Sequence, residues 1–214
     1  KTRIRTLNTL PHAHRVGVGV ERLDYTKGIL ERFLAIERLL ELQPEWIGRF
    51  SFIQIAAPSR SKIEEYQQLS RNVLASAERI NARFGSEGYR PIHVRIEHHE
   101  PQEVSLYYRG ADFCIVSSLH DGMNLVAKEF VAARDDEQGV LILSQFTGAA
   151  TELPEALLIN PYNIDQCAAA MHLSLSMAPT EQRARMRSMR GIVQEFNVYR
   201  WAGRMLMDAA RMRQ

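Results

Sequence analysis

The sequence predicts an α/β fold in which helices cover both faces of a parallel sheet. Short runs of almost purely apolar residues recur along the chain, and segments with apolar residues at every third or fourth position separate them. Strands that are apolar on both sides are typical of parallel sheets buried between two layers of helices. The architecture indicated is therefore Rossmann-like, with one domain as the default for 214 residues.

The first half of the chain is predicted to hold two strand–helix units. β-branched residues and glycines at 15–21 predict a strand, and apolar residues at helical spacing predict a helix over 28–42. The apolar run at 50–57 predicts the next strand. A helix is expected over 62–84, with Ser61 as its N-terminal cap.

The second half continues the alternation and ends in helices. Proline is favoured in the first turn of a helix, and so Pro101 predicts where one of these helices starts. The predicted elements are strands at 91–96, 111–117, 140–143 and 156–159, helices at 101–109 and 123–134, and helical structure beyond Asn163.

Composition narrows the classes of function. The net charge of +2 is too small to indicate nucleic acid as a general partner. Neither a run of about 18 apolar residues nor a secretion signal occurs, and we expect a soluble, cytoplasmic protein without membrane contact. Cys114 and Cys167 are too few for a disulfide framework and lack metal-ligand spacing, so both are expected to be buried thiols.

Two cations border the loop after the first predicted strand. Ligands in open parallel sheets bind at the carboxyl ends of the strands. Arg22 and Lys27 lie between such an end and the start of a helix, whose free amides attract anions. This placement suits a diphosphate, and the alternative is a solvated pair of surface charges. Gly17 and Gly19 lack the third glycine of a dinucleotide fingerprint, so we reject that interpretation.

A second candidate segment follows the strand that ends at Ser117. Asp121 and Gly122 begin a predicted helix whose first-turn amides can receive phosphate or sugar oxygens, although Asp121 suits a simple helix cap equally well. Glu129 in the same helix suits the hydroxyls of a ribose, or is an exposed helix charge. Arg60 precedes a helix start, where cations are disfavoured, and is a candidate for binding a second phosphate.

Four segments together resemble the trehalose-6-phosphate synthase family. They read E-R-L-D-Y-T-K-G-I at 21–29, R-I-N-A-R-F-G at 79–85, D-G-M-N-L-V-A-K-E at 121–129 and L-S-Q-F-T-G-A-A at 143–150, and the similarity covers roughly 15–204. The resemblance implies the carboxyl-terminal half of a GT-B glycosyltransferase. Such an enzyme transfers glucose from UDP-glucose to glucose 6-phosphate with retention, and requires no metal or other cofactor.

The same resemblance implies a role for each candidate residue. Arg22 and Lys27 would bind the donor diphosphate and, with Asp121 on a glucose hydroxyl, form the catalytic set. Glu129 would hold the ribose and Arg60 the acceptor phosphate. Further donor contacts would come from Gly122, Met123, Asn124, Leu125 and Val126. Departing UDP gains negative charge, so cations here would stabilise the transition state more than the ground state.

The resemblance also divides the chain. Residues 1–14 would enter from an amino-terminal domain outside this sequence, 15–196 would form the donor-binding domain, and 197–214 a terminal helix that crosses back to the other domain. Without that domain we expect little transferase activity, and either self-association or mobility of the apolar terminal stretch. His120 stands where many relatives have arginine, which would make the charge beside the donor sugar pH-dependent.

Two other functions stay open. One is a sister glycosyltransferase that uses another phosphorylated or cyclitol acceptor, because most acceptor contacts are expected outside this sequence. The other is a regulatory domain that binds a nucleotide sugar without catalysis, against which the intact set of candidate donor-binding side chains argues. The base of the donor nucleotide, uracil, guanine or adenine, is left open as well.

Overall fold

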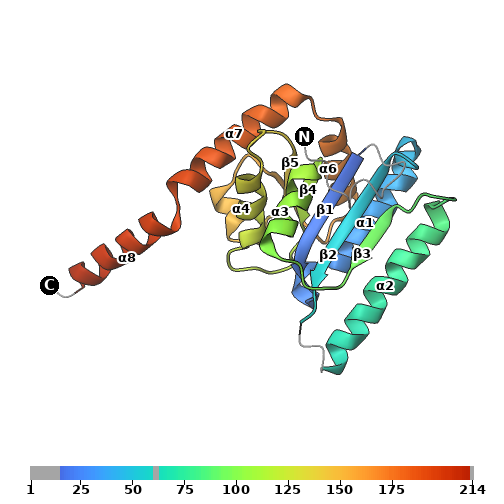
Figure 1. The fold of residues 1–214 in the computed structure, drawn as a ribbon, viewed down its shortest axis with the longest axis horizontal. Coiled ribbons are helices and arrows are strands. Elements are labelled where there is room, and N and C mark those ends of the chain that lie inside the picture. The colour runs from blue at the N-terminus through green and yellow to red at the C-terminus, as the bar shows by residue number, and fades with distance from the viewer. Residues whose placement is uncertain (1–14, 60–62, 213–214) are drawn as a thin grey trace.

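A computed structural model describes residues 15–59 and 63–212 of the chain. Within those ranges six strands form one parallel sheet in the order β3-β2-β1-β4-β5-β6 (Figure 1). The strands are β1 (Arg15–Arg22), β2 (Phe50–Ala57), β3 (Ile92–Arg95), β4 (Phe113–Val116), β5 (Val140–Ser144) and β6 (Leu157–Ile159). The predicted parallel sheet is confirmed. Its strand order reverses between β1 and β4, the kind of place at which open α/β sheets bind ligands.

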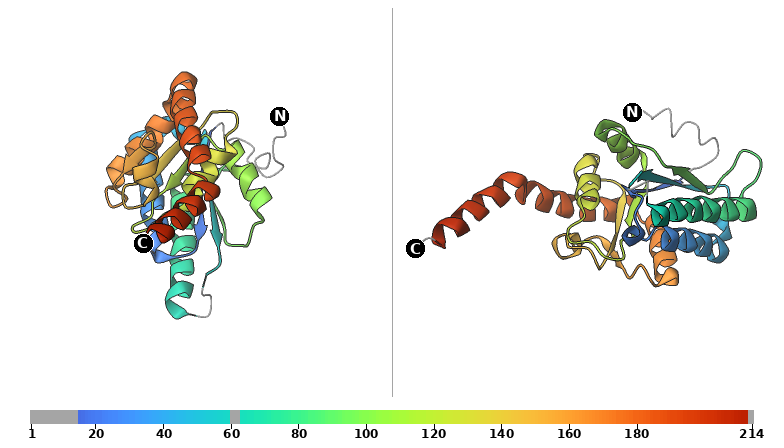
Figure 2. Two further views of the ribbon diagram at one scale, coloured as in Figure 1. Left: turned by 90° about the vertical axis from the view of Figure 1, so that its left-hand side faces the viewer. Right: turned by 90° about the horizontal axis from the view of Figure 1, so that it is seen from below.

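Helices pack on both faces of this sheet (Figures 1 and 2). One face carries α1 (Ile29–Leu42), α2 (Glu64–Phe84) and α6 (Ile164–Ser176), and the other carries α3 (Pro101–Gly110), α4 (Leu125–Ala133), the short α5 (Ala149–Glu152) and α7 (Pro179–Glu195). Strand β4 shows why both faces need covering: Phe113 and Ile115 join the first core, whereas Cys114 belongs to the second. Burial raises the pKa of both free thiols, to about 11 for Cys167.

The two glycines of β1 make room for side chains from other elements. A Cβ at Gly17 would lie 2.4 Å from the ring of Phe113, which stacks on Phe50 with ring centroids 5.7 Å apart. A Cβ at Gly19 would lie 2.1 Å from Nη1 of Arg32 on α1. Both glycines are therefore explained by packing within the domain, in agreement with the rejection of a dinucleotide fingerprint.

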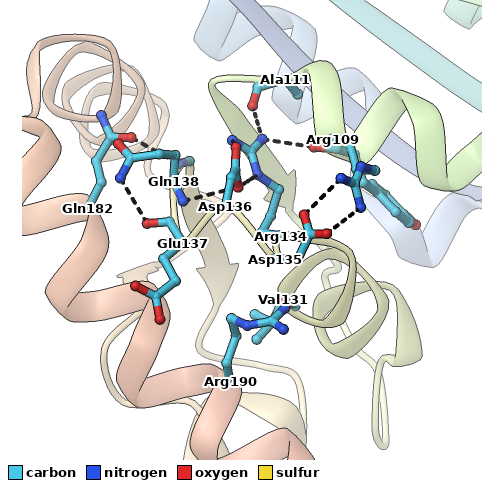
Figure 3. Close-up of polar contacts among 12 residues, drawn as sticks. Arg109, Ala111, Val131, Arg134, Asp135, Asp136, Glu137, Gln138, Gln182 and Arg190 are labelled. Atoms are coloured by element: carbon cyan, nitrogen blue, oxygen red, sulfur yellow. Dashed lines mark hydrogen bonds and ion pairs between the residues drawn. The ribbon is translucent and has the colours of Figure 1, made fainter. Parts of the chain in front are cut away.

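A polar cluster closes the edge of the sheet at which the strands begin (Figure 3). Arg134, in the connection from α4 to β5, is 4% exposed and donates to the backbone carbonyls of Tyr108 and Ala111, while its Nε lies 2.9 Å from Asp136 Oδ1. Arg109 pairs with Asp135 beside it at 2.9 Å. Arg134 thus connects the end of α3 to the segment that enters β5, at the edge of the sheet opposite the one where the strands end.

The last helix, α8 (Val198–Arg211), stands away from the body of the molecule (Figure 1 and the right-hand view of Figure 2). It follows α7 after a short break at Asn197 and buries none of its residues. The large apolar side chains that it exposes are Val198, Tyr199, Trp201, Met205, Leu206 and Met207. Among the described helices, none is long and apolar enough to cross a membrane.

Some predicted features fall outside the description or shift in position. Helix α2 begins at Glu64, with Ile63 at its N-cap position and no side-chain cap bond. The expected cap Ser61, the candidate Arg60 and the predicted entering segment 1–14 lie outside the described residues. The boundary near residue 196 between the donor-binding domain and a terminal helix that crosses back to another domain stays a prediction.

Candidate functional site

The loop between β1 and α1 folds into a tight turn. Asp24 caps the 3-10 turn η1 (Tyr25–Lys27), accepting bonds from the amide and the hydroxyl of Thr26 at 2.9 and 2.8 Å. Burial of Asp24 opposes its ionisation, but these bonds, a bond from Tyr66 and the nearby charge of Arg22 hold the pKa of the carboxyl below its usual value. Gly28 ends the turn at φ +62° and leads directly into α1.

Lys27 and Asp121, distant in sequence, meet at the carboxyl edge of the sheet. Lys27 Nζ lies 2.7 Å from Asp121 Oδ2, and each side chain is 16% exposed. Asp121 also accepts from Asn124 Nδ2 at 3.1 Å. Burial favours the neutral acid, but the bonds from Lys27 and Asn124 outweigh it, so the pKa of Asp121 is lowered. The structure thus brings together two of the three residues predicted as catalytic.

The segment that carries Asp121 rests on the loop after β5. The Asp121 amide donates to Phe146 O at 3.1 Å, and the Gly148 amide donates back to Asp121 O at 3.1 Å. A Cβ at Gly148 would lie 2.2 Å from Gly122 O, so only glycine allows this close approach. The loops after β4 and β5 therefore form one support for the candidate site.

The start of α4 corrects the sequence interpretation of this segment. The cap is Asn124, whose Oδ1 accepts from Ala127 N at 3.0 Å, and the helix begins at Leu125. Asp121 is therefore not the cap. Its Oδ1 accepts a hydrogen bond from the Met123 amide at 3.3 Å, and this bond would have to break before that amide could bind a ligand. Asn124 adopts φ +78°, and a non-glycine residue at positive φ is a local strain of the kind that clusters at functional sites.

Several backbone amides at the start of α4 are available to a ligand. Within the described part of the chain, no hydrogen bond is made by the amides of Gly122, Asn124, Leu125 and Val126. A Cβ at Gly122 would meet nothing within 4 Å, so this side of the backbone is open. Free amides at a helix start bind anions, which agrees with the predicted donor contacts.

Among the described residues, neither Arg22 nor Glu129 makes a hydrogen bond or ion pair with Lys27 or Asp121. Arg22 is exposed at the end of β1, and no hydrogen bond or ion pair of its guanidinium is found among the described residues. Glu129 is exposed on α4, but its Oε2 accepts from the hydroxyl of Tyr108 at 3.2 Å. His120 is exposed in the loop before Asp121. The guanidinium of Arg22 is thus free to bind a ligand, and the carboxylate of Glu129 is held in place.

A buried charged cluster that was not predicted from the sequence lies beneath these loops. Arg32 on α1 is 1% exposed and contacts Glu21, Gln54 and Ser117. Burial raises the pKa of Glu21, against the opposing charge of Arg32. A signal was present, because Arg32 falls on the apolar face of its helix and Gln54 interrupts an apolar strand.

A cavity of about 300 Å³ lies beside the same strand ends, between α2 and the residues that follow β1, β2 and β3 (Leu23, Pro58 and Ile96).

In the ranges that the structure covers, no group of three or more His, Cys, Asp and Glu side chains could hold a metal ion. The charged side chains predicted for the donor site are those of Arg22, Lys27, Asp121 and Glu129, and the carboxylate of Asp24 lies in the same loop as the first two.

Comparison with protein families and known sequences gives consistent matches. The model of glycosyltransferase family 20 matches residues 1–211. The UDP-forming alpha,alpha-trehalose-phosphate synthase A of Dictyostelium discoideum is 41% identical over 201 residues, which are 94% of this chain and 27% of that protein. The trehalose-6-phosphate synthase of Klebsiella pneumoniae subsp. pneumoniae is 45% identical over 190 residues, 88% of this chain and 40% of that protein. The chain thus spans less than half of these two relatives.

Solved structures show the same fold over nearly the whole chain. A UDP-forming alpha,alpha-trehalose-phosphate synthase of Burkholderia xenovorans, in complex with glucose-6-phosphate, superposes with a TM-score of 0.93 at 40% identity and covers 97% of this chain and 46% of its own. An E. coli structure with bound UDP-2-fluoro glucose gives a TM-score of 0.91 at 39% identity, and the match covers 95% of this chain and 45% of that one.

Proposed function

The chain belongs to glycosyltransferase family 20, and from this we propose that it forms the donor-binding half of a retaining glucosyltransferase. The reaction proposed is transfer of glucose from UDP-glucose to glucose 6-phosphate, giving α,α-trehalose 6-phosphate. The observation that carries the proposal is the Lys27–Asp121 pair beside the free amides at the start of α4. A cation, a carboxylate and unbonded amides are what a diphosphate and a sugar hydroxyl need in one place.

Each group has a defined task in this proposal. Lys27 carries three N–H donors, so its ammonium can keep Asp121 while it binds a phosphate oxygen. Arg22, whose guanidinium makes no hydrogen bond or ion pair among the described residues, offers a planar fork that suits phosphate. Asp121 has further acceptor capacity for a glucose hydroxyl, and Glu129 for a ribose hydroxyl.

The chemistry follows from where charge develops. Cleavage of the bond between glucose and UDP leaves a negative charge on the terminal phosphate, and fixed positive groups stabilise that charge more in the transition state than before it. The leaving phosphate takes the proton of the attacking acceptor hydroxyl on the same face of the sugar, which retains the configuration. No enzyme nucleophile is required, and Arg22 and Lys27 supply the positive charge without a metal ion.

The substrates are proposed from the named relatives. Two of them are described as UDP-forming, one solved structure holds UDP-2-fluoro glucose and another holds glucose-6-phosphate. The chain spans 46% and 45% of those two solved chains. We therefore propose that most of the acceptor site lies on a second domain that faces the carboxyl edge of this sheet, and that full activity requires this domain. From the present chain, Arg60 would reach the acceptor phosphate. A cytoplasmic location is part of the same proposal.

Calorimetric titration of this chain with UDP, UDP-glucose and GDP-glucose tests the donor site. The uridine nucleotides are expected to bind and GDP-glucose to bind more weakly. Replacing Arg22 or Lys27 by alanine should weaken UDP binding about 10- to 100-fold, since a hydrogen bond to a charged group contributes about 1.5–3 kcal/mol.

Arg109→Ala is the matched control, because Arg109 is an arginine at the opposite edge of the sheet, paired with Asp135. It should leave UDP affinity unchanged. Absence of UDP binding by the folded chain, or equal losses in all three variants, would count against the proposal. If UDP binds but the polypeptide with both domains transfers glucose to no sugar phosphate, a cyclitol acceptor or a non-catalytic binding role is favoured instead.

A further inference from the structure

A buried guanidinium lies under the loops that form the candidate site. Arg32 reaches from α1 to β1, to β2 and to the residue after β4: its Nη1 lies 2.5 Å from Glu21 Oε1 and 2.7 Å from Gln54 Oε1, and its Nε lies 3.1 Å from Ser117 Oγ. Gln54 Nε2 donates to the same Glu21 oxygen at 2.9 Å. The cluster therefore links the end of β1, the middle of β2 and the residue that follows β4.

Stability alone is a weak reason for such a cluster. Moving two charges out of water costs about as much as their attraction returns, and apolar residues of similar size often stabilise a fold equally well. Arg32 and Glu21 have side chains that are 1% and 6% exposed.

Arg32 fixes the direction in which the Ser117 hydroxyl donates. A guanidinium has only donors, so Ser117 Oγ accepts from Arg32 and keeps its own hydrogen for another partner. The available acceptors are the carbonyl of Gly28 at 2.8 Å and that of Lys27 at 3.3 Å. The buried charge is thus connected, through one hydroxyl, to the backbone of the loop that carries Lys27.

The loop has little freedom to shift against β4. Gly28 has φ +62°, and a Cβ there would lie 2.1 Å from the carbonyl oxygen of Ser117. The Leu119 amide donates to Thr26 O at 2.7 Å, a second bond between the same two segments. The backbone that carries the Lys27 side chain is therefore fixed against the segment that follows β4 and leads to Asp121.

We propose that Arg32 is a positioning residue: through Ser117 it holds the backbone of Lys27 and Gly28 so that the Lys27 ammonium points to Asp121 and to the donor diphosphate. Arg32 itself touches neither the donor nor the acceptor. The proposal rests on the diphosphate site described above, and it adds a residue that acts from beneath that site.

Ser117→Ala tests the connection with little risk to folding. It removes the hydroxyl and leaves the contacts of Arg32 with Glu21 and Gln54. We expect UDP affinity to fall about tenfold, and amide exchange of Lys27 and of Arg32, whose amide donates to Gly28 O at 3.0 Å, to become faster. Ser51→Ala is the control: Ser51 is 1% exposed and donates to Arg90 O at 3.0 Å at the other end of β2. It should change neither quantity.

A double-mutant cycle separates positioning from general loosening. If Ser117 acts through Lys27, then Ser117→Ala should weaken UDP binding in the wild type and have almost no further effect in Lys27→Ala. Arg32→Lys keeps the charge beside Glu21, but one ammonium cannot also reach Ser117, so it should reproduce the tenfold loss. Additive losses in the cycle, or equal losses in Ser117→Ala and Ser51→Ala, would overturn the proposal.

The exchange measurement keeps this inference distinct from the proposed function. If the wild-type chain binds no UDP, the donor site is wrong. Faster exchange at Lys27 in Ser117→Ala alone would still show that the hydroxyl holds the loop, and unchanged exchange would reject the positioning role as well.

Discussion

Asp121 is a half-buried carboxylate that Lys27 and Asn124 keep ionised. A carboxyl whose pKa is lowered by folding stabilises the native state above its unfolded pKa, and that contribution is lost as the pH falls through the folded pKa. Asp121→Asn should therefore lower the free energy of unfolding at neutral pH by about 1 kcal/mol. The difference from the wild type should shrink below about pH 4.

Urea unfolding of both proteins at a series of pH values measures this difference. Asp135→Asn is a suitable comparison, because Asp135 is 57% exposed and its pair with Arg109 lies at the opposite edge of the sheet. Exposed pairs contribute little, so that variant should stay close to the wild type throughout. A stability difference for Asp121→Asn that grows toward acid would contradict the assignment.

Single residues show where sequence reasoning succeeds and where it stops. Lys27 and Asp121 could be predicted to meet, because both follow strands whose carboxyl ends share one edge. Their direct ion pair could not, since it depends on the rotamers of both side chains. Arg32 was missed because a charged residue in a helix is usually exposed, and only three-dimensional packing shows that Glu21, Gln54 and Ser117 surround it.

Among the elements, α4 departs most from its predicted start. Its cap, Asn124, combines φ +78° with a side-chain bond to Ala127 N. Two variants separate these features: Asn124→Gly removes the bond and tolerates the backbone angle, whereas Asn124→Ala removes the bond and keeps a side chain at positive φ, where alanine is less tolerated than asparagine.

We expect Asn124→Ala to cost about 2 kcal/mol, roughly half from the lost cap and half because alanine is more strained than asparagine at positive φ. Asn124→Gly should cost clearly less, and thermal or denaturant unfolding gives the order. Equal stability of the two variants would mean that the backbone angle at this position is not a constraint.

The strands were predictable and this helix start was not, for a physical reason. A parallel strand buried on both faces must be apolar throughout, so 50–57 is visible in sequence as a continuous run. A helix start depends on one cap bond and one backbone angle, and the sequence D-G-M-N offers Asp121 and Asn124 as alternative caps. The contacts of Asp121 with Lys27 and of Gly148 with Gly122 decide between them.

At the scale of the whole molecule, the two edges of the sheet have separate tasks. The carboxyl edge carries Lys27, Asp121 and the free amides, and the amino edge is closed by Arg134 and its backbone partners (Figure 3). Between them lie two apolar cores, one on each face. The candidate site thus lies at one open edge of a packed body, and α8 stands away from that body.

Removal of residues 197–214 tests the role of that last helix. Because α8 buries none of its residues, we expect the shortened chain to melt within a few degrees of the full one and to keep UDP binding. The exposed apolar side chains of α8 should cause self-association of the full chain, and sedimentation velocity should show this association disappear on deletion. A monodisperse full-length monomer whose α8 amides are protected from exchange would contradict this expectation.

The pairing of Lys27 with Asp121 in the absence of a ligand has a consequence for selectivity. Asp121 balances the charge of the ammonium, so a small free anion such as inorganic phosphate finds spare N–H donors on Lys27 but little net positive charge. A diphosphate that also engages Arg22 and the amides of α4 gains several contacts at once and can bind where a single small anion does not. The site thereby rejects the abundant simple anions of a cell while it stays ready for a nucleotide sugar.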